Sequence, residues 1–265
     1  MDLGLTGKSA IVAAASSGLG QAVARALAME GTSLVMFSRR TDAIEASARE
    51  VQAAAAPGTR VIPLAADVTR PTDLERVVDT ALEQFGTVHI LYHNSGGPRP
   101  GTFDTLTDQD WEQAFELLLL PAIRLTRLCL PTMRRQHWGR VVIGTSVSVK
   151  QPLPTLMLSN SLRSAVTAWA KTLSDQVAVD NITVNTLAPG SIDTDRIRQI
   201  NADSAQRTGR TVDEVERQSL ASIPMRRYGT PAEFGAAAAF LASEQAAYIT
   251  GVTLLVDGGM FRGTY

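Results

Sequence analysis

The sequence predicts a doubly wound α/β fold, in which a mainly parallel, seven-stranded sheet carries helices on both faces. Short apolar runs alternate along the chain with longer segments whose apolar residues recur at helical spacing. Short apolar strands separated by helices of roughly 10 to 20 residues are typical of parallel strands buried on both faces. No Pro/Ser-rich linker or shift in composition divides the 265 residues, so we expect one domain over residues 1–265.

The first half of the chain begins with the pattern βαβαβ and continues it by one more helix and strand. Residues 9–15 form an apolar strand, and the glycine turn at 16–20 leads into a helix with Val23 and Leu27 on its apolar face. Further strands are expected at 33–38, 60–65 and 88–93, with helices at 43–55 and 73–85 between them. This half therefore supplies four strands of the sheet.

The second half repeats the alternation. A long helix at 109–133, interrupted near Pro121, precedes a strand at 140–145, a helix at 158–179 and a strand at 182–187. A helix at 231–241 starts with proline in its first turn, and the last strand is 253–256. The polar stretch at about 192–222 is a long connection, which predicts a lid over a site.

Composition and charge exclude several classes of protein. The 25 basic and 26 acidic residues give a formal net charge of −1, so no global field attracts nucleic acid or an anionic membrane surface. The apolar run Leu117–Leu120 is far shorter than the roughly 20 residues of a membrane-spanning helix. The start, Met1–Leu5, has no export signal, and the single Cys129 fits a reducing compartment, so we expect a cytoplasmic protein. The three histidines show no ligand spacing, so no metal is expected.

The first strand ends in the turn Ala13-Ala14-Ala15-Ser16-Ser17-Gly18-Leu19-Gly20. Glycines allow the backbone to approach a pyrophosphate, and the following helix N-terminus offers unpaired N–H groups and a positive dipole end. The alternative is a tight βα turn whose glycines serve packing only. In an open parallel sheet, ligands bind beyond the carboxyl ends of the strands where the strand order reverses, so this turn predicts a ligand site.

Six short motifs, of which the glycine turn is the first, occur in order between Leu3 and Gly259. They are the glycine turn, Ala66-Asp67-Val68-Thr69, Asn94-Ser95-Gly96-Gly97, Gly139-Arg140-Val141-Val142 leading to Ser146, Ile182-Thr183-Val184-Asn185 running into Pro189-Gly190, and Val256-Asp257-Gly258-Gly259. With these segments the chain resembles the short-chain dehydrogenase/reductase family, and most closely its branch of 3-oxoacyl-carrier-protein reductases. The resemblance implies a Rossmann-type fold, a nicotinamide dinucleotide, a small carbonyl or alcohol substrate, and homodimers or homotetramers built from the helices at 109–133 and 158–179.

The resemblance also implies which residues hold the dinucleotide. The pyrophosphate would lie on the glycine turn, the adenine near the residues after the third strand, and the nicotinamide end between the fourth and sixth strands. The residues are Ala14, Ser16, Ser17, Gly18, Leu19, Gly20, Asp67, Val68, Asn94, Gly96, Arg163, Pro189, Gly190, Ile192 and Thr194. The family's usual Thr-Gly opening of the turn is Ala13-Ala14 here. Since alanine disfavours a positive φ or adds a Cβ near the phosphate, we expect weakened binding.

The second strand ends in Ser38-Arg39-Arg40. An acidic residue at this place would bind the ribose 2′-hydroxyl of NAD, whereas arginine accommodates a 2′-phosphate. We therefore expect NADP(H) to be preferred, with NAD(H) possible as a second cofactor. The alternative is that both arginines are a solvated start of the next helix.

The family's catalytic tyrosine and lysine, four residues apart on one helix face, are both replaced. Aligning on Ser146 and on the downstream segments puts Ser159 at the tyrosine's place and Arg163 at the lysine's, and the family's asparagine falls at Leu118. The four tyrosines of the chain lie elsewhere, at Tyr92, Tyr228, Tyr248 and Tyr265. The expected catalytic set is thus Ser146, Ser159 and Arg163, in which Arg163 supplies a fixed charge but no transferable proton.

Two functions remain open at the level of the sequence. One is an NADP(H)-dependent oxidoreductase that interconverts a ketone and a secondary alcohol at an altered site. The other is a dinucleotide-binding protein without efficient redox chemistry, acting as a sensor or a partner subunit. His93 is a candidate substitute acid, or else a packed ring. Arg99, Arg196 and Arg198 could form an anion-selective mouth, or else be ordinary solvated arginines.

Overall fold

A computed structural model describes residues 2–264, so Met1 and Tyr265, and the expectations that involve them, lie outside the described residues. Seven parallel strands form one sheet in the order β3-β2-β1-β4-β5-β6-β7. The predicted doubly wound, seven-stranded α/β fold is confirmed. The strand order reverses between β1 and β4, which is where this type of sheet opens a crevice for a ligand.

The strands fall close to their predicted positions. They are β1 Ser9–Ala13, β2 Ser33–Ser38, β3 Val61–Ala65, β4 Ile90–His93, β5 Gly139–Gly144, β6 Ile182–Pro189 and β7 Thr253–Val256. The helices are α1 Gly18–Met29, α2 Thr41–Ala54, α3 Pro71–Phe85, α4 Asp108–Leu118, α5 Leu120–Arg135, α6 Met157–Val177, α7 Asp195–Thr208, α8 Val212–Ser222 and α9 Pro231–Leu241.

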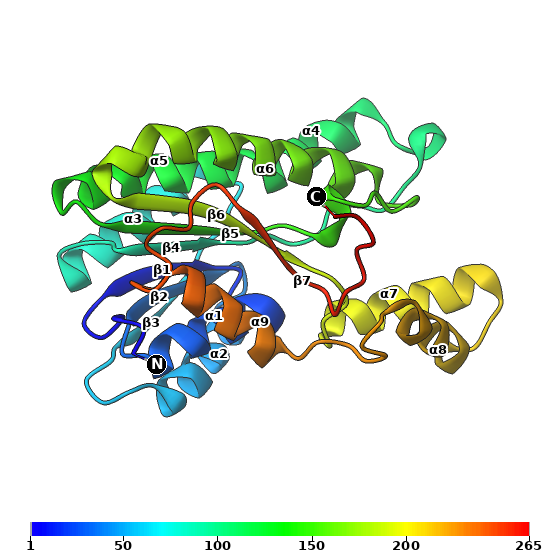
Figure 1. The fold of residues 1–265 in the computed structure, drawn as a ribbon, viewed down its shortest axis with the longest axis horizontal. Helices are drawn as coiled ribbons and strands as arrows, with labels where there is room; N and C mark the ends of the chain where they lie inside the picture. The colour runs from blue at the N-terminus through cyan, green and yellow to red at the C-terminus, as the bar shows by residue number, and fades with distance from the viewer. Residues whose placement is uncertain (1, 265) are drawn as a thin grey trace.

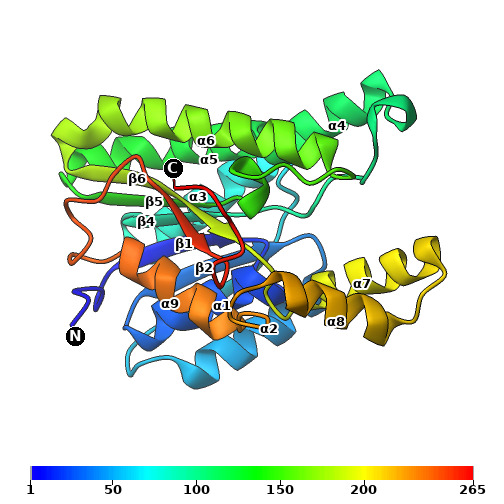
Figure 2. The same cartoon turned by 45° about the vertical axis from the view of Figure 1, so that its right-hand side comes forward.

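Helices cover both faces of the sheet. Figure 1 shows α3, α5 and α6 above it and α1, α2 and α9 below it, and the rotated view in Figure 2 keeps the two layers apart. Each layer closes its own apolar core: Val12, Leu34 and Phe234 lie in the core with α1 and α9, whereas Ile11, Leu125 and Val184 lie in the opposite one. Burial on both faces explains why the central strands are rich in apolar residues.

The predicted long helix at 109–133 is two helices. α4 ends at Leu118 and α5 begins at Leu120, with Pro121 in the first turn of α5, where a missing backbone N–H costs nothing. A second proline, Pro131, lies inside α5. Within residues 2–264, none of the helices combines the length and the apolar character that a membrane crossing requires.

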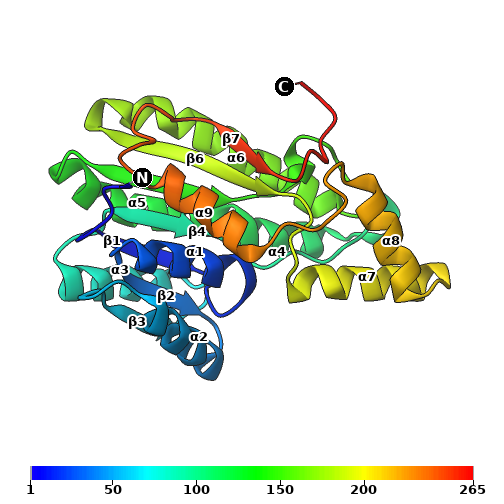
Figure 3. The same cartoon turned by 60° about the horizontal axis from the view of Figure 1, so that its bottom comes forward.

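The polar stretch after β6 folds into α7 and α8, which extend from the carboxyl edge of the sheet as an arm (Figure 3). Gly209 ends α7 in the left-handed conformation, and Thr211 with Glu214 forms a capping box at the start of α8. The base of the arm is tied: Asp193 N donates to Gly229 O at 2.8 Å, and Gly229 N donates to Ser191 O at 3.0 Å. The arm therefore leaves and rejoins the body at one point.

Candidate active site

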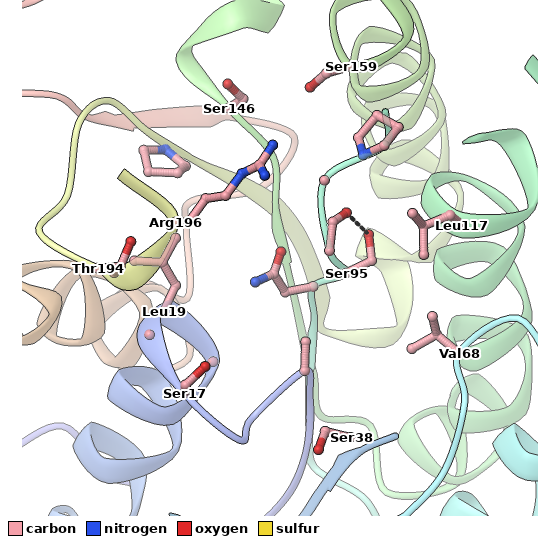
Figure 4. Close-up of a pocket in the computed structure, with 18 of the residues that line it drawn as sticks. Ser17, Leu19, Ser38, Val68, Ser95, Leu117, Ser146, Ser159, Thr194 and Arg196 are labelled. Atoms are coloured by element: carbon pink, nitrogen blue, oxygen red, sulfur yellow. Dashed lines mark hydrogen bonds between the residues drawn. The ribbon is translucent and has the colours of Figure 1, made fainter. Parts of the chain in front are cut away.

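A cleft of about 1200 Å³ opens at the carboxyl ends of β1, β2, β4, β5 and β6. It brings together all residues of the expected cofactor-binding and catalytic sets. The lining includes Ala14, Ser16, Ser17, Gly18, Leu19, Gly20, Arg39, Arg40, Asp67, Val68, Asn94, Gly96, Ser146, Ser159, Arg163, Pro189, Gly190, Ile192 and Thr194. Figure 4 shows Ser17, Leu19, Val68, Ser146, Ser159 and Thr194 around the cleft. Segments far apart in the sequence thus meet at the predicted edge of the sheet.

The glycine turn is formed despite the alanine in it. Ala14 adopts φ +53°, so the turn forms although alanine disfavours this conformation. This conformation directs the carbonyl of Ala14 toward the start of α1, where a Cβ on Gly20 would clash with that oxygen. Glycine at position 20 is therefore required by backbone packing. The hydroxyl of Ser17 makes no capping bond to α1, which leaves the N-terminal N–H groups of that helix without a side-chain partner from this residue.

The end of β2 offers hydrogen-bond donors to the cleft. The buried hydroxyl of Ser38 has no hydrogen-bond partner among residues 2–264, and neither Arg39 nor Arg40 forms an ion pair with the described carboxylates. Both arginines are exposed and line the cleft. A buried hydroxyl costs free energy unless a partner reaches it, so this corner fits a polyanionic ligand group. Sequence analysis missed Ser38 because a serine at a strand end gives no signal of its own.

Across the cleft, the carboxylate of Asp67 is held by its own loop. Its Oδ1 atom accepts hydrogen bonds from the backbone N–H of Thr69 at 2.9 Å and from the hydroxyl of Thr69 at 2.8 Å. The backbone N–H of Asp67 donates to Asp73 at 2.8 Å, and this bond is the main reason why the pKa of Asp73 lies below its ordinary value. These contacts fix the loop that places Asp67 and Val68 at the adenine end expected from the resemblance.

Arg163 is a buried cation on the wall of the cleft. It lies on α6 and is 9% exposed, with Nη1 donating to the carbonyl of Gly144 at 3.2 Å and Nη2 to that of Gly96 at 3.5 Å. Burial, with a smaller contribution from the charge of Arg196, lowers the pKa of its guanidinium to about 10. No carboxylate among residues 2–264 pairs with it, so its charge is available to a ligand.

The two serines of the predicted catalytic set face the same part of the cleft as Arg163. Ser159 stands one helical turn before Arg163 on α6, and Ser146 follows β5, where its hydroxyl accepts a bond from the N–H of Ser148 at 3.1 Å. In Figure 4 both serines lie in the upper part of the view, toward which the side chain of Arg196 points. Two hydroxyls and one cation can bind and polarise a carbonyl oxygen.

No tyrosine within residues 2–264 lines the cleft. Tyr92 is buried beside Arg163, and burial raises the pKa of its phenol; Tyr228 accepts a hydrogen bond from Asn201, and Tyr248 is fully exposed. Leu118, at the place of the family's asparagine, is buried and does not line the cleft. His93 is not a substitute acid, since it is 2% exposed, lies outside the lining, and burial lowers its pKa to about 3.

The three arginines of the proposed mouth differ in their partners. Arg99 forms an ion pair with Asp110 at 2.8 Å, and Arg198 forms pairs with Asp193 and Asp195. Arg196 pairs with none of the carboxylates in the described part of the chain, and it lines the cleft. Apolar groups missed by sequence analysis complete this end of the cleft: Leu117, Leu156, Ile197 and Ile200. Among residues 2–264, no three potential metal ligands cluster.

An open parallel sheet with its cleft at the reversal of strand order, and with a glycine turn leading into a helix there, defines a dinucleotide-binding protein of the Rossmann type. Residues 13–261 match the family model described as enoyl-(acyl carrier protein) reductase. The chain is 34% identical to the NADPH-dependent reductase BacG of Bacillus subtilis over 255 residues, which cover 96% of this chain and 98% of that protein. It is 32% identical to the 3-oxoacyl-[acyl-carrier-protein] reductase FabG of Vibrio cholerae, covering 98% of this chain and 99% of the relative.

A solved structure extends the likeness to three dimensions. The L-sorbose reductase of Gluconobacter frateurii, complexed with NADPH and L-sorbose, matches with a TM-score of 0.93 and 32% identity over 99% of this chain and 100% of that one. The chain belongs to the short-chain dehydrogenase/reductase family. The relatives named here are reductases, and two of them are described with NADPH.

Proposed function

We propose that this protein is an NADP(H)-dependent oxidoreductase that interconverts a ketone and a secondary alcohol. The observation that carries the proposal is the buried, carboxylate-free guanidinium of Arg163, which stands with Ser146 and Ser159 at one end of a cleft whose other end is the glycine turn. The relatives described above include an NADPH-dependent reductase and a sugar reductase crystallised with NADPH, which supports the same class of reaction.

The cleft suits a phosphorylated dinucleotide. Its pyrophosphate would lie on Ser16, Ser17 and the N–H groups of α1, its 2′-phosphate near Ser38, Arg39 and Arg40, and its nicotinamide near the residues at the ends of β4 and β6. When bound, the cofactor supplies or accepts the hydride. NADP(H) is favoured over NAD(H) because two arginines without carboxylate partners stand where an acidic residue would hold a free ribose hydroxyl. Equal or tighter binding of NADH than of NADPH in a fluorescence titration would refute that preference.

The residues of the chain position and polarise the carbonyl group. The hydroxyls of Ser146 and Ser159 donate hydrogen bonds to the carbonyl oxygen, and the charge of Arg163 stabilises the negative charge that develops there as hydride reaches the carbon. The proton that completes the alcohol comes from water in the open cleft, since a serine hydroxyl is a weak acid and Arg163 retains its proton. Because no phenol delivers that proton, turnover is expected to be about 10²- to 10⁴-fold slower than at a site with a positioned general acid.

The experiment is an NADPH titration followed by turnover with a panel of ketones, in the wild type, in Arg163→Ala and in Lys171→Ala. Lys171 is a matched control, because it lies on the same helix, is exposed and is ion-paired with Asp175 at 3.5 Å. Turnover is expected in the wild type and in Lys171→Ala, and is expected to be lost in Arg163→Ala. Replacing Ser159 by tyrosine together with Arg163 by lysine is expected to raise the rate if the register assigned to α6 is right.

A second candidate is a dinucleotide-binding sensor or partner subunit without efficient redox chemistry. It is favoured by the substitutions at Leu118, Ser159 and Arg163, three of the four usual catalytic positions of the family. Tight NADPH binding without turnover on any ketone would select this candidate over the enzyme.

We further propose a homodimer or homotetramer that packs through α4, α5 and α6. Phe115 on α4 is 40% exposed, and the intermediate exposure of Leu119 and Leu120 leaves further apolar surface beside it. Burial of this surface between subunits would contribute about 25 cal/mol per Å². A monomer in light scattering at micromolar concentration would refute this proposal.

A further inference from the structure

The cleft holds a second guanidinium close to Arg163. Arg196 lies in the first turn of α7, and a Cβ on Gly97 would come within 3.0 Å of its Nη2 atom. Arg163 donates to the carbonyl of Gly96, the residue before Gly97. The two guanidinium groups therefore flank the same pair of glycines, and Figure 4 shows Arg196 reaching toward Ser146 and Ser159 and away from Ser17.

Arg196 differs from its neighbours in having no ion pair or side-chain hydrogen bond with residues 2–264. Arg198, two residues later, is held by two aspartates, and Arg99 across the cleft is held by Asp110. Two like charges that flank one glycine pair repel each other, and the pKa of Arg163 is lowered in part by this neighbour. An anion between them would remove the repulsion and would receive charge-assisted hydrogen bonds from both sides.

The place of this charge distinguishes a substrate group from a cofactor group. The pyrophosphate is expected to bind at Ser17 and Gly18. The side chain of Arg196 points away from Ser17 in Figure 4. The same cleft is lined by Ser146 and Ser159, which are expected to hold the carbonyl oxygen, and by the apolar side chains of Leu156, Ile197 and Ile200. The cleft can thus accept a ketone, an oxyanion beside it and an apolar remainder.

We propose that the substrate is an oxo acid, whose carboxylate binds Arg196 while its ketone oxygen binds Ser146 and Ser159. This inference rests on the proposed ketone reduction and names the substrate class of the same site. Arg196 determines specificity: it binds the carboxylate with equal strength before and during hydride transfer, so its loss raises KM and leaves kcat nearly unchanged for the acid.

The test uses pyruvate, acetoacetate and levulinate, each beside its methyl ester, which differ in the number of carbons between ketone and carboxylate. Dihydroxyacetone phosphate serves as the phosphate-bearing probe. The variants are Arg196→Gln, Arg196→Lys and, as a matched control on the same helix, Arg198→Gln. For at least one acid, the wild type is expected to have a kcat/KM at least tenfold above that of its ester. Arg196→Gln is expected to abolish the preference for the acid over its ester, and Arg196→Lys is expected to keep part of it. Arg198→Gln is expected to leave kcat/KM unchanged for both the acid and the ester.

Three results would overturn the inference. The first is a wild type that uses every ester as well as its acid. The second is an equal loss for acid and ester in Arg196→Gln, or a tenfold rise in its dissociation constant for NADPH, which would place the guanidinium on the cofactor. The third is a preference for dihydroxyacetone phosphate over all three acids, which would make the anion a phosphate.

A readout without turnover separates this inference from the proposed function. Calorimetry of each acid and ester with the complex of the protein and oxidised NADP⁺ measures binding where no reduction can occur. Acid binding at least tenfold tighter than ester binding, lost in Arg196→Gln, supports the anion site even if no ketone is reduced. Equal binding of acid and ester refutes the site even if ketones are turned over.

Discussion

Replacing Arg163 by methionine is expected to stabilise the protein while abolishing turnover. Burial lowers the pKa of this guanidinium from 12.5 to about 10, and each tenfold change in proton affinity is worth about 1.4 kcal/mol, so holding the charge costs about 3 kcal/mol. The bond to the carbonyl of Gly144 offsets about 1.5 kcal/mol of this cost, whereas the bond to Gly96, at 3.5 Å, is too long to add much. Methionine keeps the length of the side chain without its charge.

The net gain is about 1 to 2 kcal/mol, which corresponds to a rise of about 3 to 6 °C in Tm for a chain of this size. Because the pKa of Arg163 is lower in the folded state than in the unfolded state, the cost is fully present at every pH below about 10 and declines above it.

The assay is thermal unfolding at pH 7 without cofactor, with Arg49→Met as the control, since Arg49 is exposed and pairs with no carboxylate of residues 2–264. The control should change Tm by about 1 °C or less. A Tm for Arg163→Met below that of the wild type would refute the reasoning, because the hydrogen bonds would then outweigh the desolvation.

Three further predictions concern the turn after β1, the end of β5 and the end of β2. Ala14→Gly removes the cost of a positive φ on alanine and should raise the free energy of unfolding by about 0.5 to 1 kcal/mol in urea titrations, whereas an unchanged or lower value would show that the turn is unstrained. Gly144→Ala places a Cβ 2.9 Å from the hydroxyl of Tyr92 and should cost about 1 to 3 kcal/mol; the double variant with Tyr92→Phe should recover part of this, and no recovery would contradict the proposed clash. Arg39→Gln with Arg40→Gln should weaken NADPH binding by about 10- to 100-fold and change NADH binding less than about twofold, and calorimetry showing equal losses would exclude a 2′-phosphate contact.

The alternation of strands and helices could be predicted because local signals agree with the fold. Apolar runs of strand length, proline in the first turns of α3 and α9, and glycine at the start of α1 all indicate the same elements. The arm could not be predicted in this way. α7 buries only Asn201 and Ala205, and α8 has no buried residue, so neither helix shows a marked apolar face. The capping box at Thr211 and Glu214 was the available signal for α8.

The site was predictable in its location and less so in its chemistry. Strand ends and family-like segments were enough to predict nineteen of the residues that line the cleft. The sequence does not show which of Arg99, Arg196 and Arg198 is free of an acidic partner. The partner of Arg99 is eleven residues away and becomes its partner only when α4 folds back. The close approach of Tyr92 to Gly144 likewise joins two strands that are adjacent only in the folded sheet. Pairing of this kind depends on tertiary structure and leaves no local signal.

The two backbone hydrogen bonds that tie Ser191 and Asp193 to Gly229 make the arm modular. Its outer end, around Gly209, can be lengthened, shortened or exchanged between relatives. Thr194 and the catalytic residues should stay in place, because the bonds at Gly229 hold the base of the arm. A chimera that carries the tip of another reductase should consequently fold and retain its affinity for the dinucleotide, while acquiring the donor's preference for substrates that reach beyond Ile200.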